Sequence, residues 1–292
     1  MASTSPIKNR ITKLKKEYDK IKEGKESLLK LIDETEIAES VYNSNAIENS
    51  TLTLKETEKI LMEMEVSRNV SLREVFEAKN LARIMDYLEN KKGEIELNKE
   101  MILLLHKMLI SNINDEIAGR FRKKGEYVRV GYHIAPAPEK IEMLMEEALR
   151  NYSGDLNNFV TDKIAQFHVE FEYIHPFIDG NGRMGRVLIN LILIQLGFPK
   201  IIIRNKEKKY YYQALQNYDN TKNTKSMEKI IALSVIESLH KRIAYLKGDK
   251  IMTLTDYGHK YKKTAPSLIN AAHRQNIPAF REKGIWKIGV KI

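Results

Sequence analysis

The sequence contains no cysteine, one tryptophan, and only 7 prolines and 14 glycines among 292 residues. The absence of cysteine excludes disulfide bridges, thiolate zinc sites, iron–sulfur clusters and cysteine nucleophiles. The modest proline and glycine content excludes a collagen-like or low-complexity chain. The longest apolar run, residues 187–198, is too short to cross a membrane and is interrupted by Asn190 and Gln195. With 42% hydrophobic residues, the chain predicts a globular, soluble, cytoplasmic protein without a membrane partner.

Positive charge is concentrated at the two ends of the sequence. The whole chain has 49 lysines and arginines against 39 acidic residues, a net charge of +10. Residues 1–30 hold nine basic and four acidic residues, and residues 251–292 hold eight and two. Such segments suit an anionic partner, such as a nucleotide or a nucleic acid, but surface charge of this size also serves solubility alone.

Apolar residues at helical spacing predict that most of the chain is α-helical. One stripe near the N-terminus consists of Ile7, Ile11, Leu14, Tyr18 and Ile21. Residues 53–56 and 71–74 have the capping-box form S/T-x-x-E, which predicts that helices begin there. Residues 119–138 differ, because alternating residues near glycines and prolines predict a short β-hairpin.

The residues best suited to chemistry are concentrated between 175 and 186, in the sequence HPFIDGNGRMGR. Gly180, Asn181 and Gly182 tolerate unusual backbone angles, so their N–H groups can converge on an anion. The apolar residues that follow predict a helix, whose N-terminus favours the same anion. We therefore expect a turn that binds phosphate.

Charged side chains flank this turn. Arg183 and Arg186 are three residues apart, hence on one face of the predicted helix, where their guanidinium groups can hold phosphates. Asp179 offers a hard oxygen ligand for a Mg²⁺ ion that also contacts substrate phosphates. His175 precedes a proline that ends the previous helix, and its imidazole is suited to act as a general base.

A dinucleotide-binding motif is the main alternative for the same residues. Residues 180–185 also satisfy G-x-G-x-x-G, and residues 200–207 offer an apolar run and an acid at a spacing typical of nicotinamide-binding folds. Against this alternative, the apolar residues of 164–174 fit helical spacing, and no further strand–helix–strand units follow. The pattern favours a phosphate site of another kind and leaves both interpretations open.

Residues 175–186 resemble the signature of the Fic family, H-P-F-x-D/E-G-N-G-R-x-x-R, and match every defined position. The resemblance covers about residues 40–240 and includes 119–138, which is similar to the flap hairpin of that family. It implies an all-α Fic fold, a helical bundle with a short β-hairpin flap. It also implies transfer of AMP from ATP to a Ser, Thr or Tyr hydroxyl of a target protein, with Mg²⁺ as cofactor.

The resemblance assigns roles to individual residues of the motif. His175 would accept the proton of the target hydroxyl, and Asp179 would hold Mg²⁺ between the α- and β-phosphates. The backbone of the glycine turn would bind the α-phosphate, and Asn181 would orient it. Arg183 and Arg186 would bind the β- and γ-phosphates.

Two further sites are implied by the same resemblance. Tyr212 would border the adenine of ATP. The flap would pair with the backbone of the target as an added strand and would place the target hydroxyl in line with the phosphate. The flap residues expected to do so are Val128, Val130, His133 and Ile134.

A second motif precedes this core. Ser44, Glu48 and Asn49 match S/T-x-x-x-E-G/N, which resembles the inhibitory helix of class II Fic proteins, here at about residues 41–49. The resemblance implies that Glu48 pairs with Arg186, occupies the space of the γ-phosphate and keeps the enzyme inactive. Removal of AMP with the help of the same glutamate is also compatible with this arrangement. Without the Fic motif, the residues alone favour an ordinary helix end with Asn49 as its C-terminal cap.

The composition changes after Gly248, so we expect an N-terminal helical region 1–100, a Fic core 101–248 and a C-terminal unit 249–292. The C-terminal unit predicts two helices and a two-stranded wing, similar to the winged helix-turn-helix units that follow some Fic cores. Its positive charge suits contact with DNA, and the alternative is a basic lid anchored by Trp286. A DNA-binding regulator whose Fic core senses nucleotide is therefore the alternative function. A homodimer is compatible with either.

Overall fold

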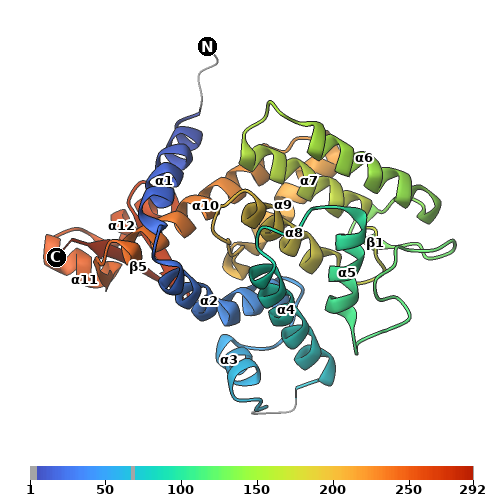
Figure 1. The fold of residues 1–292 in the computed structure, drawn as a ribbon, viewed down its shortest axis with the longest axis horizontal. Helices are drawn as coiled ribbons and strands as arrows, with labels where there is room; N and C mark the ends of the chain where they lie inside the picture. Colours follow the sequence, from blue (N-terminus) through green and yellow to red (C-terminus); the bar gives the residue numbers. More distant parts are fainter. Residues whose placement is uncertain (1–4, 67–69, 292) are drawn as a thin grey trace. The chain divides into compact units, whose positions relative to one another are not determined.

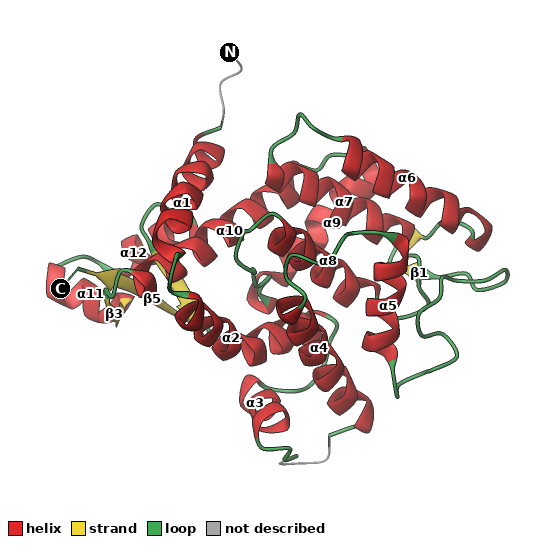
Figure 2. Ribbon diagram, in the orientation of Figure 1, coloured by secondary structure: helices red, strands yellow, loops and turns green. Residues whose placement is uncertain are grey.

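The computed structural model describes residues 5–66 and 70–291. Most of these residues lie in α-helices, and the strands form two small antiparallel sheets (Figure 2). The expected helical fold with a short hairpin is thereby confirmed. Within the described ranges, no helix combines the length and the apolar character that a bilayer crossing requires.

The chain forms two compact units that alternate along the sequence. One consists of Met1–Glu36, Phe198–Ile201 and Ala232–Ile292, and the other of Ile37–Gly197 and Ile202–Ile231. The sequence-based boundaries at 100 and 248 cut the chain into consecutive segments instead. The difference arises because α2 (Glu26–Ile47) and α10 (Lys225–Leu246) each contribute residues to both units, so two borders fall inside helices.

The larger unit contains the helices around residues 175–186 (Figure 1). After the end of α2, its elements are α3 (Leu54–Met62), α4 (Leu72–Asn90), α5 (Lys99–Ile110), β1 (Arg129–Val130), β2 (His133–Ile134), the 3-10 helix η1 (Pro138–Lys140), α6 (Ile141–Gly154), α7 (Val160–Ile174), α8 (Asn181–Gln195), the 3-10 helix η2 (Asn205–Glu207) and α9 (Lys208–Thr221). Strands β1 and β2 form the predicted hairpin, with Val130 opposite His133.

Helix α8 forms the core of this unit. It packs against α4, α5 and α7, and 13 of its 15 residues are buried. A helix that is largely apolar on all sides must be enclosed by other helices, and each fully buried aliphatic side chain contributes about 1.5–3 kcal/mol. Burial therefore fixes the position of the N-terminus of α8, where the glycine turn lies.

Helices α3 and α4 begin at the predicted caps. Thr53 and Glu56 form a complete capping box, in which each side chain accepts a hydrogen bond from the other residue's backbone N–H, at 3.2 and 2.9 Å. The Ser71 hydroxyl accepts a hydrogen bond from the N–H of Glu74 at 3.2 Å. The Glu74 carboxylate, in turn, accepts one from the N–H of Thr51 at 2.7 Å. The second cap therefore also connects the start of α4 to the segment after α2.

The other unit contains the small C-terminal sheet. Besides parts of α2 and α10, its elements are α1 (Pro6–Lys22), β3 (Lys250–Thr253), α11 (Leu254–Tyr261), α12 (Ala265–His273), β4 (Ala279–Glu282) and β5 (Ile285–Val290). The sheet has the order β3-β5-β4, and its strands are antiparallel. Two helices and the β4–β5 hairpin lie where they are expected, whereas β3 is a third strand that the sequence pattern did not indicate. Trp286 packs against the core of this unit, with the Arg281 guanidinium 4.5 Å from the centre of its ring.

Candidate active site

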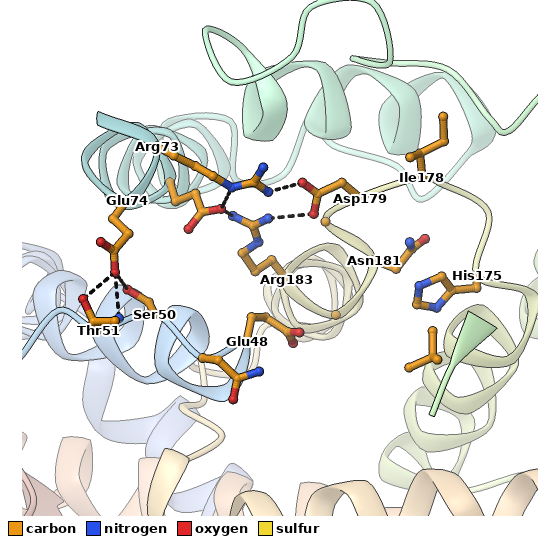
Figure 3. Close-up of a pocket in the computed structure, with 15 residues that line it drawn as sticks. Glu48, Ser50, Thr51, Arg73, Glu74, His175, Ile178, Asp179, Asn181 and Arg183 are labelled. Atoms are coloured by element: carbon orange, nitrogen blue, oxygen red, sulfur yellow. Dashed lines mark hydrogen bonds and ion pairs between the residues drawn. The ribbon is translucent and has the colours of Figure 1, made fainter. Parts of the chain in front are cut away.

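A cavity of about 520 Å³ lies at the N-terminus of α8 (Figure 3). This volume falls within the range of small-molecule sites. Its walls come from the end of α2, the start of α4, the flap and the loop between α7 and α8. The lining residues are Glu48, Asn49, Ser50, Thr51, Arg73, Glu74, Glu77, Val130, His175, Ile178, Asp179, Gly180, Asn181, Gly182 and Arg183.

His175 ends helix α7 and lines this cavity. Its backbone is left-handed, with φ 50° and ψ 60°, and its N–H donates to the carbonyl of Phe171 at 2.9 Å. Pro176 follows and cannot continue the helix. The carbonyl of His175 accepts a hydrogen bond from Arg122 Nε at 2.9 Å. The helix cap, Pro176 and the hydrogen bond from Arg122 together fix the backbone that carries the imidazole.

The imidazole of His175 is neutral and has one nitrogen available as a base. Its Nδ1 lies 3.4 Å from the carbonyl oxygen of Glu172, and because a carbonyl only accepts, Nδ1 carries the proton. Nε2 is then the nitrogen with a free lone pair. Burial, assisted by the charge of Arg122, lowers the pKa of His175 to about 4. The side chain can therefore accept a proton at neutral pH without first losing one.

The loop between α7 and α8 is held by hydrogen bonds from inside the protein. The Asn181 amide accepts from the N–H of Phe177 at 2.9 Å and donates to its carbonyl at 2.8 Å. The ring of Phe177 stacks on His106 at 3.6 Å. His106 Nδ1 accepts from the N–H of Gly119 at 3.0 Å, so its Nε2 carries the proton and donates to the carbonyl of Asp179 at 3.0 Å. Both polar atoms of the Asn181 amide thus serve the loop, whereas the sequence predicts that this amide orients a phosphate.

Four charged side chains form a closed network on one wall of the cavity (Figure 3). Arg183 pairs with Asp179 Oδ1 at 3.2 Å and with Glu77 Oε1 at 3.0 Å. Arg73 pairs with the other oxygen of Asp179 and, through Nε at 3.0 Å, with the same oxygen of Glu77. Burial alone would raise the pKa of Asp179, but Arg183 and Arg73 outweigh it and lower the pKa below its usual value. Asp179 is therefore a carboxylate, and its charge is balanced.

Arg186 is bound by the end of helix α2. Its Nε donates to the Ser44 hydroxyl at 3.0 Å, and its Nη2 donates to the Ser44 carbonyl at 2.8 Å and to Glu48 Oε1 at 2.9 Å. The Arg186 side chain is only 6% exposed. Burial would lower its pKa, but Glu48 reverses this effect and raises it. The expected pair between Glu48 and Arg186 is thus present in the structure.

A Schellman motif places the Glu48 carboxylate at the glycine turn. The N–H of Ser50 donates to the carbonyl of Asn45 at 3.0 Å, and the N–H of Asn49 donates to that of Ala46 at 3.1 Å. Asn49 has φ 69°, which an asparagine tolerates. A Cβ atom added to Gly182 would overlap the Glu48 carboxylate. Asn49 is therefore a helix cap, and the same cap directs Glu48 to the N-terminus of α8.

Comparison with known proteins assigns this site to a family. Residues 96–193 match the model of the Fic/DOC family. The chain also resembles the solved structure of a Fic-domain-containing signaling protein from Bacteroides thetaiotaomicron, with a TM-score of 0.73 and 25% identity over 82% of this chain and 98% of that chain. Residues 96–193 are a Fic domain. The predicted family is thereby confirmed.

Further relatives extend the similarity beyond the matched segment. Fic-1 from C. elegans superposes with a TM-score of 0.70 and 25% identity over 81% of this chain and 70% of that one. The curated protein adenylyltransferases Fic of Drosophila grimshawi and Drosophila melanogaster are 30% and 31% identical over 179 residues, or 60% of this chain. This Fic protein covers little more than a third of their length, 37% and 36%.

The dinucleotide alternative is excluded by the element that precedes the glycines. That motif requires a strand before the turn and a parallel sheet around it. In this Fic protein the turn follows helix α7, and all strand pairs in the described residues are antiparallel. Residues 201–203, which resemble an apolar strand in sequence, lie outside any strand.

A group of titratable side chains, the buried Tyr211 and His168 and the half-buried Glu172, lies next to Arg186 and was not identified from the sequence. The Tyr211 hydroxyl lies 3.4 Å from Glu172 Oε1 and 2.9 Å from His168 Nε2. Burial, and then the nearby charge of Glu48, raise the pKa of Glu172 to about 8. Glu172 therefore keeps its proton at neutral pH. Its neighbours on α7 are apolar residues at helical spacing, so the sequence offers no sign that this glutamate faces inward.

Replacement of Glu172 by glutamine is expected to change the pH dependence of stability. Because the pKa of Glu172 is raised in the folded state, the wild type loses stability as the pH rises from about 4.5 to 8, when only the unfolded chain releases the proton. Glutamine mimics the protonated acid and removes this loss. The free energy of unfolding of Glu172→Gln, relative to wild type, should therefore increase by about 1 kcal/mol per pH unit over this range. Urea denaturation at pH 5, 6, 7 and 8 measures it.

The exposed Glu146→Gln substitution on α6 is the control for the loss of one acidic group. It should show a difference from wild type that does not depend on pH. A difference equally constant for Glu172→Gln would mean that Glu172 is already ionised in the folded protein.

Gly180 combines a left-handed backbone with close packing. Its φ is 84°, and an added Cβ would lie 3.1 Å from side-chain carbons of Ile110 and Leu109. We expect Gly180→Ala to lower the free energy of unfolding by about 2–3 kcal/mol, measured by urea denaturation, because backbone strain and crowding add. Gly93→Ala is the matched control, since Gly93 has φ 91° with open space around it. Gly93→Ala should lower the free energy of unfolding by only about 1 kcal/mol. Equal losses for the two variants would contradict the role of crowding at Gly180.

The predicted flap residues divide between the cavity and the outer surface. Val130 lines the cavity, and Ile134 is 72% exposed. His133 belongs to neither group, because its Nε2 donates to the carbonyl of Tyr173 at 2.8 Å and its Nδ1 lies 3.5 Å from Asp219. Val128 accepts a hydrogen bond from the N–H of Ala135 at 3.1 Å and closes the base of the hairpin.

Tyr212 does not line the cavity. Its hydroxyl donates to the carbonyl of Ile47 at 3.0 Å, at the end of α2. It therefore supports the helix end that carries Glu48. Arg73 and Glu77, by contrast, line the cavity although no sequence pattern indicates it, since they belong to a helix about one hundred residues before the motif.

The residues present fit a magnesium ion that shares its coordination with phosphates. Asp179 is an ionised carboxylate on the cavity wall, and its side chain is 30% exposed. Residues 5–66 and 70–291 contain no group of three or more acidic or histidine side chains that could enclose a metal by themselves. Mg²⁺ is commonly held by one or two carboxylates together with substrate phosphates, which is the donor set available here.

Proposed function

We propose that this Fic protein transfers AMP from ATP to a Ser, Thr or Tyr hydroxyl of a target protein, and that Glu48 keeps it inactive at rest. The observation that carries the proposal is the position of the Glu48 carboxylate. It binds Arg186 and lies over Gly182 at the N-terminus of α8, where the helix favours an anion. The names of the Drosophila relatives, protein adenylyltransferase, support the reaction class.

In the proposed reaction, Nε2 of His175 accepts the proton of the target hydroxyl. The hydroxyl oxygen forms a bond to the α-phosphorus of ATP, and the bond from that phosphorus to the bridging oxygen breaks. Pyrophosphate leaves with the electron pair. The neutral imidazole described above suits this step, because a general base must be unprotonated when the substrate binds.

The triphosphate is held by the start of helix α8. The first N–H groups of a helix have no partner within it, so those of the glycine turn are available to the α-phosphate. The guanidinium groups of Arg183 and Arg186 bind the β- and γ-phosphates through bidentate, charge-assisted hydrogen bonds. Asp179, together with the phosphates, would hold Mg²⁺, which would supply neutralisation of charge on the leaving group. Positioning and electrostatics of this kind supply most of the acceleration in phosphoryl-type transfer.

Inhibition follows from competition for one guanidinium. Arg186 donates to Ser44 and to Glu48, so it cannot form full contacts with a γ-phosphate at the same time. A carboxylate over Gly182 also repels a phosphate that approaches the same turn. ATP then binds without its γ-phosphate in the productive position, and transfer is slow.

Intact-mass spectrometry of Glu48→Gly after incubation with ATP and Mg²⁺ tests the reaction class. We expect a mass increase of one adenylate group on the protein itself, or on proteins of a lysate supplied with ATP labelled at the α-phosphorus, together with release of pyrophosphate. An increase of one phosphate group would indicate phosphorylation instead. ATP binding without any covalent change would favour the alternative function, a nucleotide-sensing regulator.

A further inference from the structure

Arg73 pairs with one of the two carboxylate oxygens of Asp179. It reaches the site from the first turn of α4, 106 residues earlier in the sequence, and binds Oδ2, while Arg183 binds Oδ1. Both oxygens of the only acidic residue in the motif are thus paired with guanidinium groups (Figure 3). A divalent cation cannot bind Asp179 closely while both pairs remain.

We propose that Arg73 competes with the divalent cation for Asp179 and so sets the affinity of the site for a metal-bound nucleotide. This inference rests on the proposed function, which places the cation at Asp179. Arg73 thereby limits access of the cation to Asp179, whereas Glu48 limits access of a phosphate to Arg186. The two contacts involve different residues and come from different helices, α4 and α2.

The surroundings of the two arginines indicate that Arg73 is the one that leaves. Its side chain is 55% exposed, and that of Arg183 is 4% exposed. Arg73 also keeps a partner after release, because its Nε lies 3.0 Å from Glu77 on the same helix, at i+4 spacing. Release therefore requires a change of side-chain rotamer and no movement of the backbone.

Charge balance gives the direction of the effect. Arg73, Glu77, Arg183 and Asp179 together are neutral. A divalent cation at Asp179 adds two positive charges beside the Arg73 guanidinium, and like charges at such distances repel. Binding of the cation must therefore break the Arg73–Asp179 pair, and removal of the guanidinium should make the cation bind more tightly.

The test compares nucleotide affinity with and without the cation. Isothermal titration calorimetry of the full chain with a non-hydrolysable ATP analogue, in Mg²⁺ and in EDTA, gives the factor by which Mg²⁺ improves binding. All proteins carry Glu48→Gly, so that the Glu48 carboxylate does not compete for Arg186 in any of them. We expect Arg73→Gln to increase this factor by about 3- to 10-fold, and Arg73→Lys to give a smaller increase because the positive charge stays.

Two variants control this measurement. Arg83→Gln removes the same charge from the same helix, but Arg83 donates to the carbonyl of Met108, so the factor should not change. Asp179→Asn should reduce the factor to about one, because the ligand of the cation is lost.

The outcomes separate this inference from the proposed function. If Asp179→Asn removes the effect of Mg²⁺ but Arg73→Gln leaves it unchanged or weakens it, the competition is wrong while AMP transfer stands. If Asp179→Asn keeps the effect of Mg²⁺, the cation is not at Asp179, and both this inference and the assigned metal site are wrong. Adenylate transfer, measured by mass, remains an independent result in either case.

Discussion

Glu48→Gly is expected to raise the rate of AMP transfer by about 10- to 100-fold over wild type, the range typical of coupling between an inhibitory contact and a ligand. The substitution removes the carboxylate that binds Arg186 at 2.9 Å and lies over Gly182. Arg186 and the N–H groups of the turn then become available to phosphates. Glu48 follows the last residue of α2, so a glycine there does not interrupt the helix. The initial rate of adenylate incorporation from labelled ATP measures the effect.

A graded series separates the loss of the carboxylate from general loosening of the helix end. Ser44→Ala removes one of the hydrogen bonds to Arg186 but leaves the Glu48 pair, and should raise the rate only a few-fold. Glu63→Gly is the matched control, because Glu63 is the exposed residue that caps α3. Its rate should equal that of wild type. Equal rates for Glu48→Gly and Glu63→Gly would show that Glu48 does not inhibit.

The contact of the end of α2 with Arg186 was implied by the resemblance to the class II inhibitory motif, and helical spacing is consistent with it. Ser44 and Glu48 are four residues apart, so they lie on one face of a helix and can meet the same partner. Asn49 was open to two interpretations, and the structure shows that they are compatible: its left-handed backbone ends the helix and thereby directs Glu48 to the turn. The local pattern indicated the helix end and its cap, whereas the partner of Glu48, 138 residues away, was implied by the resemblance alone.

Contacts between distant segments were not predictable from the same patterns. Arg73 follows a recognisable cap at Ser71, but nothing in that cap indicates a partner at Asp179, more than one hundred residues later. The amide of Asn181 shows a different limit, because its partner is close in the sequence. Its position in the motif predicts a contact with phosphate, whereas the closed loop gives it the backbone of Phe177 as a nearer partner. The Arg73 contact therefore depends on tertiary structure, whereas the Asn181 contacts join residues four apart within one loop.

The small C-terminal sheet shows a similar limit. The hairpin of β4 and β5 has the alternation and the turn residues of a local motif, and it lies where it is expected. Strand β3 covers only Lys250–Thr253 and pairs with β5, about forty residues later. A strand of four residues has too little alternation to be distinguished from a loop without its partner.

His175→Asn, made in the Glu48→Gly protein, is expected to reduce AMP transfer by about 100- to 10,000-fold, the usual contribution of a general base. Asparagine is the informative replacement because His175 has φ 50°, a left-handed conformation that asparagine tolerates, whereas alanine adds about 1–2 kcal/mol of strain. Affinity for the ATP analogue should change little, since the imidazole is assigned to the hydroxyl. Calorimetry and the rate of adenylate incorporation measure the two effects separately. His259→Asn, at an exposed position of α11, should keep full activity.

The pH dependence of kcat/KM provides a second measurement of the same residue, because this ratio reports the free enzyme. His175 has a pKa lowered to about 4, so its basic form is complete above about pH 5 and is lost only as the pH falls through 4. The ratio should therefore stay nearly constant between pH 6 and 8, whereas a histidine with an ordinary pKa of about 6.5 would lose about three quarters of its basic form by pH 6. A decline of that size would mean that the imidazole is solvated and does not occupy the buried position from which it can reach the hydroxyl.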